Sequence, residues 1–223
     1  MSASDPAVRK IAVVGLGAIG GWIAAALHRA GAEVSALARG TTLQALQTTG
    51  LTVHQDGQTG VYRLQASDSA AELGPQDVVV LAVKAPALRQ VAGQVAPLLK
   101  PGTLVLTAMN GVPWWFLQGF GGACAGQALH SVDADGQIAA AFAAQPLAGG
   151  VVHCSATTEA PAVVRHHFGN GLILGSPSGQ PSAGLDAVVA LLQRGGIQAS
   201  LSTQIQKDVW FKLWGNMSVN PVS

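Results

Sequence analysis

Three glycines near the start of the chain have the spacing of a phosphate-binding turn. Gly15, Gly17 and Gly20 form the pattern G-x-G-x-x-G after a short apolar run. In this pattern the first glycine allows a tight turn, the second lets the backbone approach a pyrophosphate, and the third lets a helix pack against a strand. A helix N-terminus also offers free N–H groups to the phosphates. We therefore predict a dinucleotide site made by the segment Gly15, Leu16, Gly17, Ala18, Ile19 and Gly20.

A single arginine bears on which dinucleotide binds. Sites for NAD place Asp or Glu about 20 residues further on, to hold the ribose 2′-hydroxyl, whereas NADP sites use an Arg for the 2′-phosphate. No acidic residue lies between Val34 and Gln55, and Arg39 follows Gly15 by 24 residues. This pattern favours NADP. If Arg39 is instead a solvated residue at the end of a strand, NADPH and NADH would bind alike.

One lysine and two asparagines near the other end of the sequence could form a polar stripe. Lys212, Asn216 and Asn220 follow at intervals of four residues, so in a helix each lies about 40° around the axis from the last. Asparagine disfavours helices, which suggests a role for the stripe. The neighbouring residues are bulky and apolar, so we expect them to surround the lysine; they are Val209, Trp210, Leu213, Trp214 and Met217. A solvated polar face is the simpler alternative.

The elements that would position these residues alternate between strand and helix. We expect strands at 10–15, 33–38, 77–83 and 103–109, with helices at 18–30 and 85–99. Asp56-Gly57 predicts a hairpin over 51–65. Weaker strands are expected at 149–153, 163–167 and 172–174. This order is typical of an α/β protein with a Rossmann-like doubly wound sheet.

A stretch rich in serine, proline and glycine, at 176–182, indicates a linker. After it we expect a helix at 183–193, a strand at 197–201 and a last helix at 203–221. We therefore predict an NADP-binding Rossmann domain over 1–178, and over 179–223 the start of an all-helical second domain.

Composition excludes several classes of protein. The 223 residues are 49% hydrophobic and 10% charged, with a formal net charge of +1, so the chain is neither disordered nor a nucleic-acid binder. No apolar run reaches the roughly 20 residues of a membrane span, and no secretory leader is evident. We expect a cytoplasmic protein without a membrane contact. The His and Cys residues lack metal-ligand spacing, so no metal site is expected.

Several motifs occur in the order found in the ketopantoate reductase (2-dehydropantoate 2-reductase) family, which the sequence resembles along its whole length. They are the glycine pattern, Leu37-Ala-Arg39, Val83-Lys84-Ala85, Asn110-Gly111, Gly169-Asn-Gly171 and the run from Trp210 to Asn220. The resemblance implies that Lys84, Asn110 and Ala156 lie near the nicotinamide end of NADP. It also implies that Lys212 is the proton donor, and that the substrate is bound by Asn110, Asn216 and Asn220.

The function implied by the resemblance is NADPH-dependent reduction of a small 2-oxo acid, with 2-dehydropantoate (ketopantoate) as the expected substrate. A related hydroxyacid dehydrogenase with another substrate is the alternative. Trp114 and Trp115, just after Asn110-Gly111, either pack in the interior or reshape the substrate pocket.

Members of the family continue into further helices, with a serine and a glutamate that this sequence lacks. We therefore expect a truncated chain, for which a non-catalytic NADPH-binding module is another reading. An uncovered apolar helix at the end also predicts self-association, with a possible homodimer through that helix.

Overall fold

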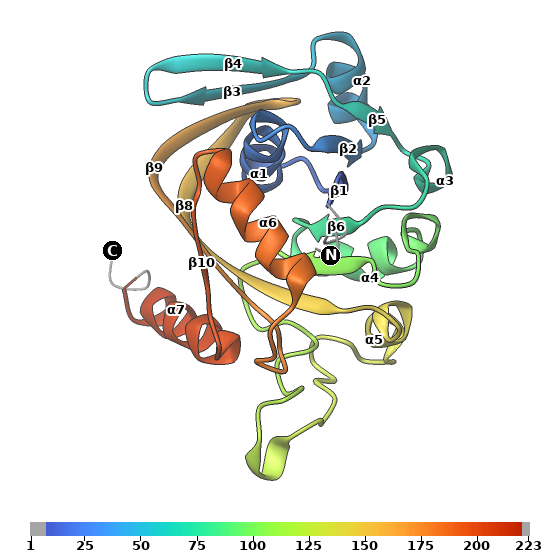
Figure 1. Cartoon of the computed structure of the whole chain (residues 1–223), viewed down its shortest axis with the longest axis vertical. Helices are drawn as coiled ribbons and strands as arrows, with labels where there is room; N and C mark the ends of the chain where they lie inside the picture. Colours follow the sequence, from blue (N-terminus) through green and yellow to red (C-terminus); the bar gives the residue numbers. More distant parts are fainter. Residues whose placement is uncertain (1–7, 220–223) are drawn as a thin grey trace, which may run out of the picture.

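A single ten-stranded sheet organises the molecule in the computed structural model, which describes residues 8–219 (Figure 1). The strand order is β4-β3-β9-β8-β7-β6-β1-β2-β5, and β10 pairs with β9. The strands are β1 (Lys10–Val14), β2 (Glu33–Leu37), β3 (Leu51–Gln55), β4 (Gln58–Tyr62), β5 (Gln65–Ser67), β6 (Val78–Leu81), β7 (Leu104–Thr107), β8 (Leu147–Ala160), β9 (Val163–Gly175) and β10 (Gln198–Leu201).

Six of the described helices lie between these strands, and α7 (Ile205–Val219) follows the last strand. The six are α1 (Ala18–Arg29), α2 (Gly40–Thr48), α3 (Ala70–Leu73), α4 (Ala85–Ala92), α5 (Gln137–Phe142) and α6 (Ala183–Arg194), with short 3₁₀ turns η1 (Ala96–Leu98) and η2 (Gly122–Cys124). Among the described residues, no helix is long and apolar enough to cross a membrane.

The centre of the sheet is parallel and covered on both faces. β1 pairs in parallel with β2 on one side and β6 on the other, and the four residues of β6 are fully buried. The carboxyl ends of these strands meet at one edge, and the chain order reverses at β1. In open α/β sheets ligands bind at such a switch point. The expected Rossmann-like α/β fold is confirmed.

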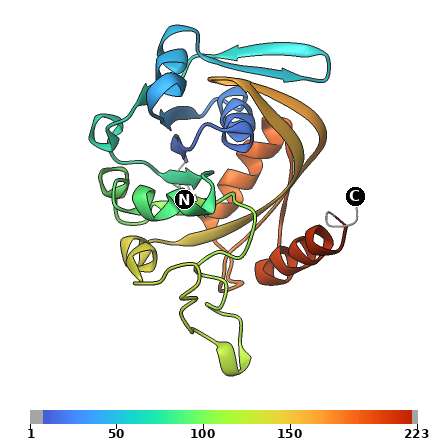
Figure 2. The ribbon, with the colours of Figure 1, turned by 180° about the vertical axis from the view of Figure 1, so that it is seen from behind.

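Two apolar cores lie on opposite faces of the sheet. Trp22 of α1 and Leu192 of α6 belong to one core. The other core contains Leu88 of α4, Phe142 of α5 and Trp115 from the loop after β7. Figure 2 shows the sheet and its helices from behind. The chain therefore has a covered sheet whose carboxyl edge stays free to form a site.

Several elements differ from the expected ones. The helix expected over 85–99 ends at Ala92, because Gly93 follows and Pro97 cannot continue a helix. The three weak strands expected after residue 149 are two long strands, β8 and β9, which pair antiparallel with bulges. Helices α2 and α5 were not foreseen.

Residues just beyond the linker join the sheet. β10 pairs in parallel with β9, and α6 packs close to α1: a Cβ on Gly195 would lie 2.0 Å from the Ala26 carbonyl oxygen. The Arg29 guanidinium also donates to the Gly195 carbonyl. These residues belong to the segment expected to open the second domain. We propose that the division expected after residue 178 falls instead between β10 and α7.

Candidate active site

The glycine turn joins the end of β1 to α1. Gly15 has a φ of 92°, and a Cβ there would lie 2.7 Å from Val83 Cγ1. A Cβ on Gly20 would lie only 1.9 Å from the Gly15 carbonyl oxygen, so the turn and the helix need both glycines. At Gly17 a Cβ would meet nothing within 4 Å. The second glycine thus borders open space, which is where a pyrophosphate would approach the backbone.

A groove of about 630 Å³ opens in front of this turn at the carboxyl edge of the sheet. Five of the expected cofactor residues line it, namely Gly15, Leu16, Gly17, Arg39 and Lys84. Ala18, Ile19 and Gly20 form the first turn of α1 behind them. No capping side chain and no acidic residue occupies the start of α1, so its N–H groups and dipole face the groove unopposed.

Two cationic side chains, Arg39 after β2 and Lys84 after β6, line the groove. Arg39 is exposed, immediately precedes α2 and lines the groove together with Thr42. Among the described residues, no carboxylate forms an ion pair with Arg39 or Lys84. Both cations are therefore available to an anionic ligand.

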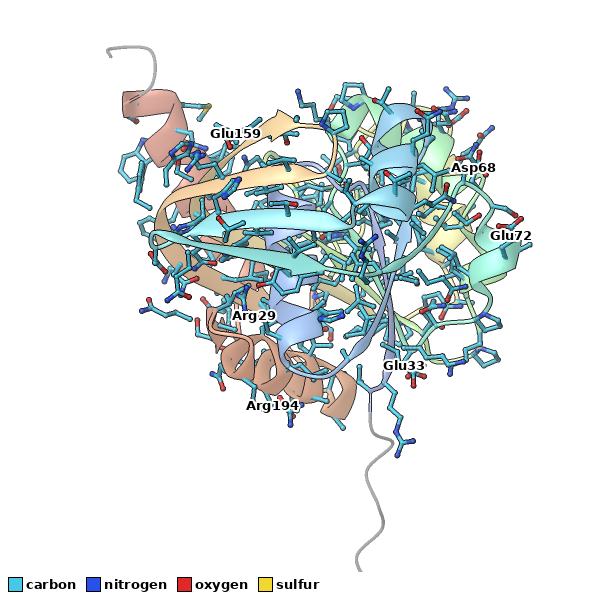
Figure 3. The ribbon with its side chains drawn as sticks, turned by 90° about the horizontal axis from the view of Figure 1, so that it is seen from above. Arg29, Glu33, Asp68, Glu72, Glu159 and Arg194 are labelled. Carbon is cyan, nitrogen blue, oxygen red and sulfur yellow. The ribbon has the colours of Figure 1, made fainter. Side chains whose placement is uncertain are left out.

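The sequence did not point to several other groove residues. Thr42, Asp68, Gln90, Gln94 and Thr158 also line it. Figure 3 shows Asp68 on the side of the molecule where α2 and β5 lie. These residues belong to no local motif, because the folding of distant segments brings them to one groove. Ala156 lies two residues before Thr158 on β8, half-buried against the core beside α1, and it lines neither the groove nor a cavity described below.

Lys212 lies on the side of α7 that faces β8. It shares a crevice of about 20 Å³ with Asn110 and Asn216, lined also by Met109, Gly111, Gly150, Val151, Val209 and Leu213. The Lys212 ammonium is half-buried and donates to the carbonyl of Val152 on β8. The fold thus gathers three of the expected site residues, although Asn110 and Lys212 are far apart in the sequence. Asn220 lies outside the described residues.

Burial governs the ionisation of groups around this lysine. Burial lowers the pKa of Lys212 below its ordinary value, with the neighbouring Cys154 acting in the opposite direction. Burial likewise raises the pKa of the Cys154 thiol to about 11. The thiol therefore stays protonated at neutral pH, and Lys212 releases a proton more readily than a solvated lysine.

The apolar residues of α7 divide between two faces. Val209 and Leu213 line the crevice with Lys212. Trp210, Trp214 and Met217 were expected around the lysine too, but they are 53%, 57% and 54% exposed. The expectation is corrected for these three residues, because the helix turns them away from β8.

A second cavity, of about 310 Å³, adjoins the crevice. The two share Met109, Asn110, Gly111, Gly150 and Val209.

Trp115 is 1% exposed and also lines this cavity. Its indole N–H donates to Thr107 Oγ1 at 3.2 Å, whereas Trp114 stacks on Phe142 with ring centroids 5.4 Å apart. Trp114 therefore packs in the interior, whereas Trp115 packs in the interior and also lines a cavity.

Comparisons with known proteins agree with this arrangement. The family model of ketopantoate reductase PanE/ApbA matches residues 11–179. A 2-dehydropantoate 2-reductase of Mesorhizobium japonicum is 42% identical over 215 residues, covering 96% of this chain and 66% of that protein. One from Halobacterium salinarum is 30% identical, covering 95% of this chain and 63% of its own length.

Solved structures show the same likeness. A crystal structure provisionally assigned as a ketopantoate reductase, from Ralstonia solanacearum MolK2, superposes with a TM-score of 0.91 at 50% identity, covering 97% of this chain and 67% of that one. The chain thus spans about two thirds of the length of each of these relatives. On the family match and these identities, the chain belongs to the ketopantoate reductase PanE/ApbA family.

Proposed function

We propose that the groove binds NADPH and that the chain carries out the reductase chemistry of its relatives on a 2-oxo acid, 2-dehydropantoate being the favoured substrate. The observation that carries this proposal is the crevice in which Lys212 meets Asn110 and Asn216, at the same sheet edge as the glycine turn. Two relatives that the chain resembles bear the name 2-dehydropantoate 2-reductase.

The groove residues suit a phosphorylated dinucleotide. The open space at Gly17 and the uncapped start of α1 accept the pyrophosphate. Arg39, beside the N-terminus of α2, suits the 2′-phosphate that distinguishes NADP from NAD. Lys84, Asn110 and Ala156 are proposed to lie toward the nicotinamide end.

The chain's own residues then orient the substrate and supply a proton. NADPH, when bound, supplies the hydride. Asn110 and Asn216 hold the 2-oxo acid through their amide groups, with Asn220 proposed as a third such residue. The Lys212 ammonium stabilises the negative charge that develops on the carbonyl oxygen and gives that oxygen a proton. Its lowered pKa favours this transfer.

The role of Lys212 is tested by Lys212→Ala with Lys207→Ala as its control. Lys207 is an exposed lysine of the same helix. Loss of a general acid costs about 10²–10⁴-fold in rate, so NADPH consumption with 2-dehydropantoate should fall by that factor in Lys212→Ala only. If the turnover of Lys212→Ala stays within tenfold of that of the unchanged chain, Lys212 is not the proton donor. NADPH binding measured in parallel shows whether the groove is intact.

We also propose that two copies of the chain associate through α7. Trp210, Phe211, Trp214 and Met217 are each more than half exposed on this one helix, and contiguous apolar surface of this kind marks interaction sites. The formal net charge of +1 gives two copies little electrostatic reason to repel.

A further inference from the structure

Asp68 places a carboxylate in the groove, and the chemistry proposed above gives this residue no role. It directly follows β5, is exposed, and lines the groove together with Arg39 and Thr42. Within the described residues, no cationic side chain forms an ion pair with Asp68. Its charge repels the phosphates of a dinucleotide. The carboxylate therefore favours binding only where the ligand brings a hydrogen-bond donor to it.

The strand order fixes where Asp68 lies along the groove. β1, β2 and β5 are neighbours in the sheet and run parallel, so the glycine turn, Arg39 and Asp68 follow them in a row at the carboxyl edge. The Ala38 N–H donates to the Ser67 carbonyl at 3.0 Å, which continues the pairing up to the two charged residues. Two strand spacings, roughly 10 Å, separate Asp68 from the turn.

The groups in the adenylate half of NADP have the same order. The pyrophosphate is followed by the ribose with its 2′-phosphate, and the ribose by the adenine base. The pyrophosphate is proposed above to lie at the glycine turn and the 2′-phosphate at Arg39. The base is then the group that reaches Asp68, one strand further along the sheet.

The wall of the groove at α4 suits a flat ring. Val83, Ala87 and Val91 are half-buried apolar residues of this wall, and Gln90 and Gln94 flank them. Ala87, Val91 and Gln94 follow at intervals of four and three residues, so they share one face of the helix and its end. A base that lies against this apolar surface keeps its polar edge free for a partner.

We propose that the Asp68 carboxylate accepts a hydrogen bond from the exocyclic amino group of the adenine, so that the chain selects adenine dinucleotides over those with a 6-oxo purine. Adenine carries an amino donor where guanine carries a carbonyl acceptor, and hypoxanthine has the same carbonyl. An ionised carboxylate can only accept, so a 6-oxo base loses the bond. This inference rests on the proposed binding of NADPH in the groove, and it adds the residue that determines which base is accepted.

Calorimetry with NADP⁺ and with nicotinamide hypoxanthine dinucleotide phosphate tests the inference without any reaction. The two ligands differ in the base alone. A hydrogen bond to a charged group changes binding by roughly tenfold or more. The dissociation constant of the hypoxanthine analogue should therefore be roughly tenfold higher than that of NADP⁺. Equal dissociation constants would overturn the inference.

Two substitutions of Asp68 test whether this residue causes the preference. Asp68→Ala removes the acceptor, so the ratio of the two dissociation constants should fall to about one. In Asp68→Asn the amide can accept from adenine or donate to the 6-oxo group. The ratio should again be about one, with both ligands bound more tightly than by Asp68→Ala. The lost charge acts on both ligands alike and cancels in the ratio.

The ratio also separates the base from the rest of the cofactor. If Asp68 contacts a ribose hydroxyl instead, both substitutions change the two dissociation constants equally and the ratio stays as in the unchanged chain. That result contradicts the inference.

Glu33→Gln is the matched control. Glu33 is an exposed carboxylate at the start of β2, so it lies at the opposite edge of the sheet from Asp68. Figure 3 shows the two labelled residues well apart. Both dissociation constants should stay unchanged in this variant. A fall of the ratio in Glu33→Gln would mean that remote charge sets the preference, and the assignment to Asp68 would be wrong.

The outcomes separate the two proposals. If NADP⁺ and the hypoxanthine analogue bind the unchanged chain equally well, Asp68 has no such role and the proposed function stands. If neither ligand binds, the proposed cofactor groove is wrong and this inference falls with it.

Discussion

Arg39 brings a positive charge to the groove from the end of β2, and within the described residues no carboxylate pairs with it. A hydrogen bond to a charged group contributes about 1.5–3 kcal/mol. Arg39→Ala should therefore raise the dissociation constant for NADPH by roughly 10–100-fold and leave that for NADH unchanged. Calorimetry with both nucleotides measures this.

Arg194→Ala is the matched control for that substitution. Figure 3 shows Arg194 on α6, away from Asp68 and the groove. If Arg39→Ala weakened the binding of both nucleotides equally, Arg39 would not contact the 2′-phosphate, and the proposed preference for NADPH would lose its basis.

The lowered pKa of Lys212 has a consequence for the pH dependence of the rate. In its proposed role Lys212 gives a proton from its charged ammonium, so the rate of the proposed reduction should fall as pH rises through the pKa of Lys212. Because burial lowers this pKa, the fall should occur below pH 10.5, the ordinary value for lysine. The pH profile of kcat measures it, and a profile flat up to that value would contradict the acid role.

The residues of the glycine turn were predictable because their requirements are local. Gly15 needs a positive φ, and Gly20 needs contact with a backbone oxygen five residues earlier. Asp68 and Thr158 reach the same groove only through strand pairing, from β5 and β8. No local sequence pattern predicts that these two residues line the groove.

Asp77 joins elements at the start of β6. Its carboxylate accepts the backbone N–H groups of Arg9 and Lys10, each at 2.9 Å, and pairs with Lys100 at 2.6 Å. Burial alone would raise the pKa of Asp77, but the hydrogen bonds from Lys10, Lys100 and Arg9 outweigh it and lower the pKa.

Removing this carboxylate should destabilise the sheet. Asp77→Ala should lower the free energy of unfolding by about 1.5–3 kcal/mol at pH 7. A lowered pKa stabilises the fold above the unfolded value of about 3.9, and this stabilisation is lost as pH falls below it. The difference in free energy of unfolding between the unchanged chain and Asp77→Ala, measured by urea denaturation, should thus become smaller below about pH 4. If this difference does not change with pH, the charge of Asp77 is not its source.

Elements with a local signal were predicted well, and those that depend on pairing were not. Asp56 and Gly57 take φ values of 52° and 73°, and β3 and β4 pair around them as expected. Glycines and short polar runs interrupt the apolar pattern of β8 and β9, so the sequence pattern does not indicate strands of 14 and 13 residues. Their extended form comes from pairing with each other, which sequence periodicity does not report.

At the scale of the whole molecule, the apolar face of α7 should govern assembly. Trp214→Ser should shift light-scattering mass toward the monomer. Phe168→Ser, at a position of β9 that is 71% exposed, should leave the mass unchanged. A monomer at all concentrations before any substitution would refute association through α7.

The position of the boundary between the two expected domains depends on contacts that composition does not report. The serine- and proline-rich stretch at 176–182 looks like a boundary in composition. Yet the Gln206 amide donates to the Pro177 and Gln118 carbonyls at 2.7 Å each, which ties this stretch to the start of α7 and to another loop. Composition reports the lack of regular structure in a segment, and it does not report what that segment contacts.

β8 links the two halves of the site. The carbonyl of Val152 accepts a hydrogen bond from the Lys212 ammonium, and Thr158 lines the groove. Between these two residues the pairing of β8 with β9 shifts register, from His153 to Ala156. A bulge absorbs an added residue while the pairing on either side continues. Insertions or deletions in these few residues should therefore change the distance between Lys212 and the groove while the rest of the sheet stays paired. This short stretch is then the place where evolution, or a designer, would retune the geometry of the proposed reaction.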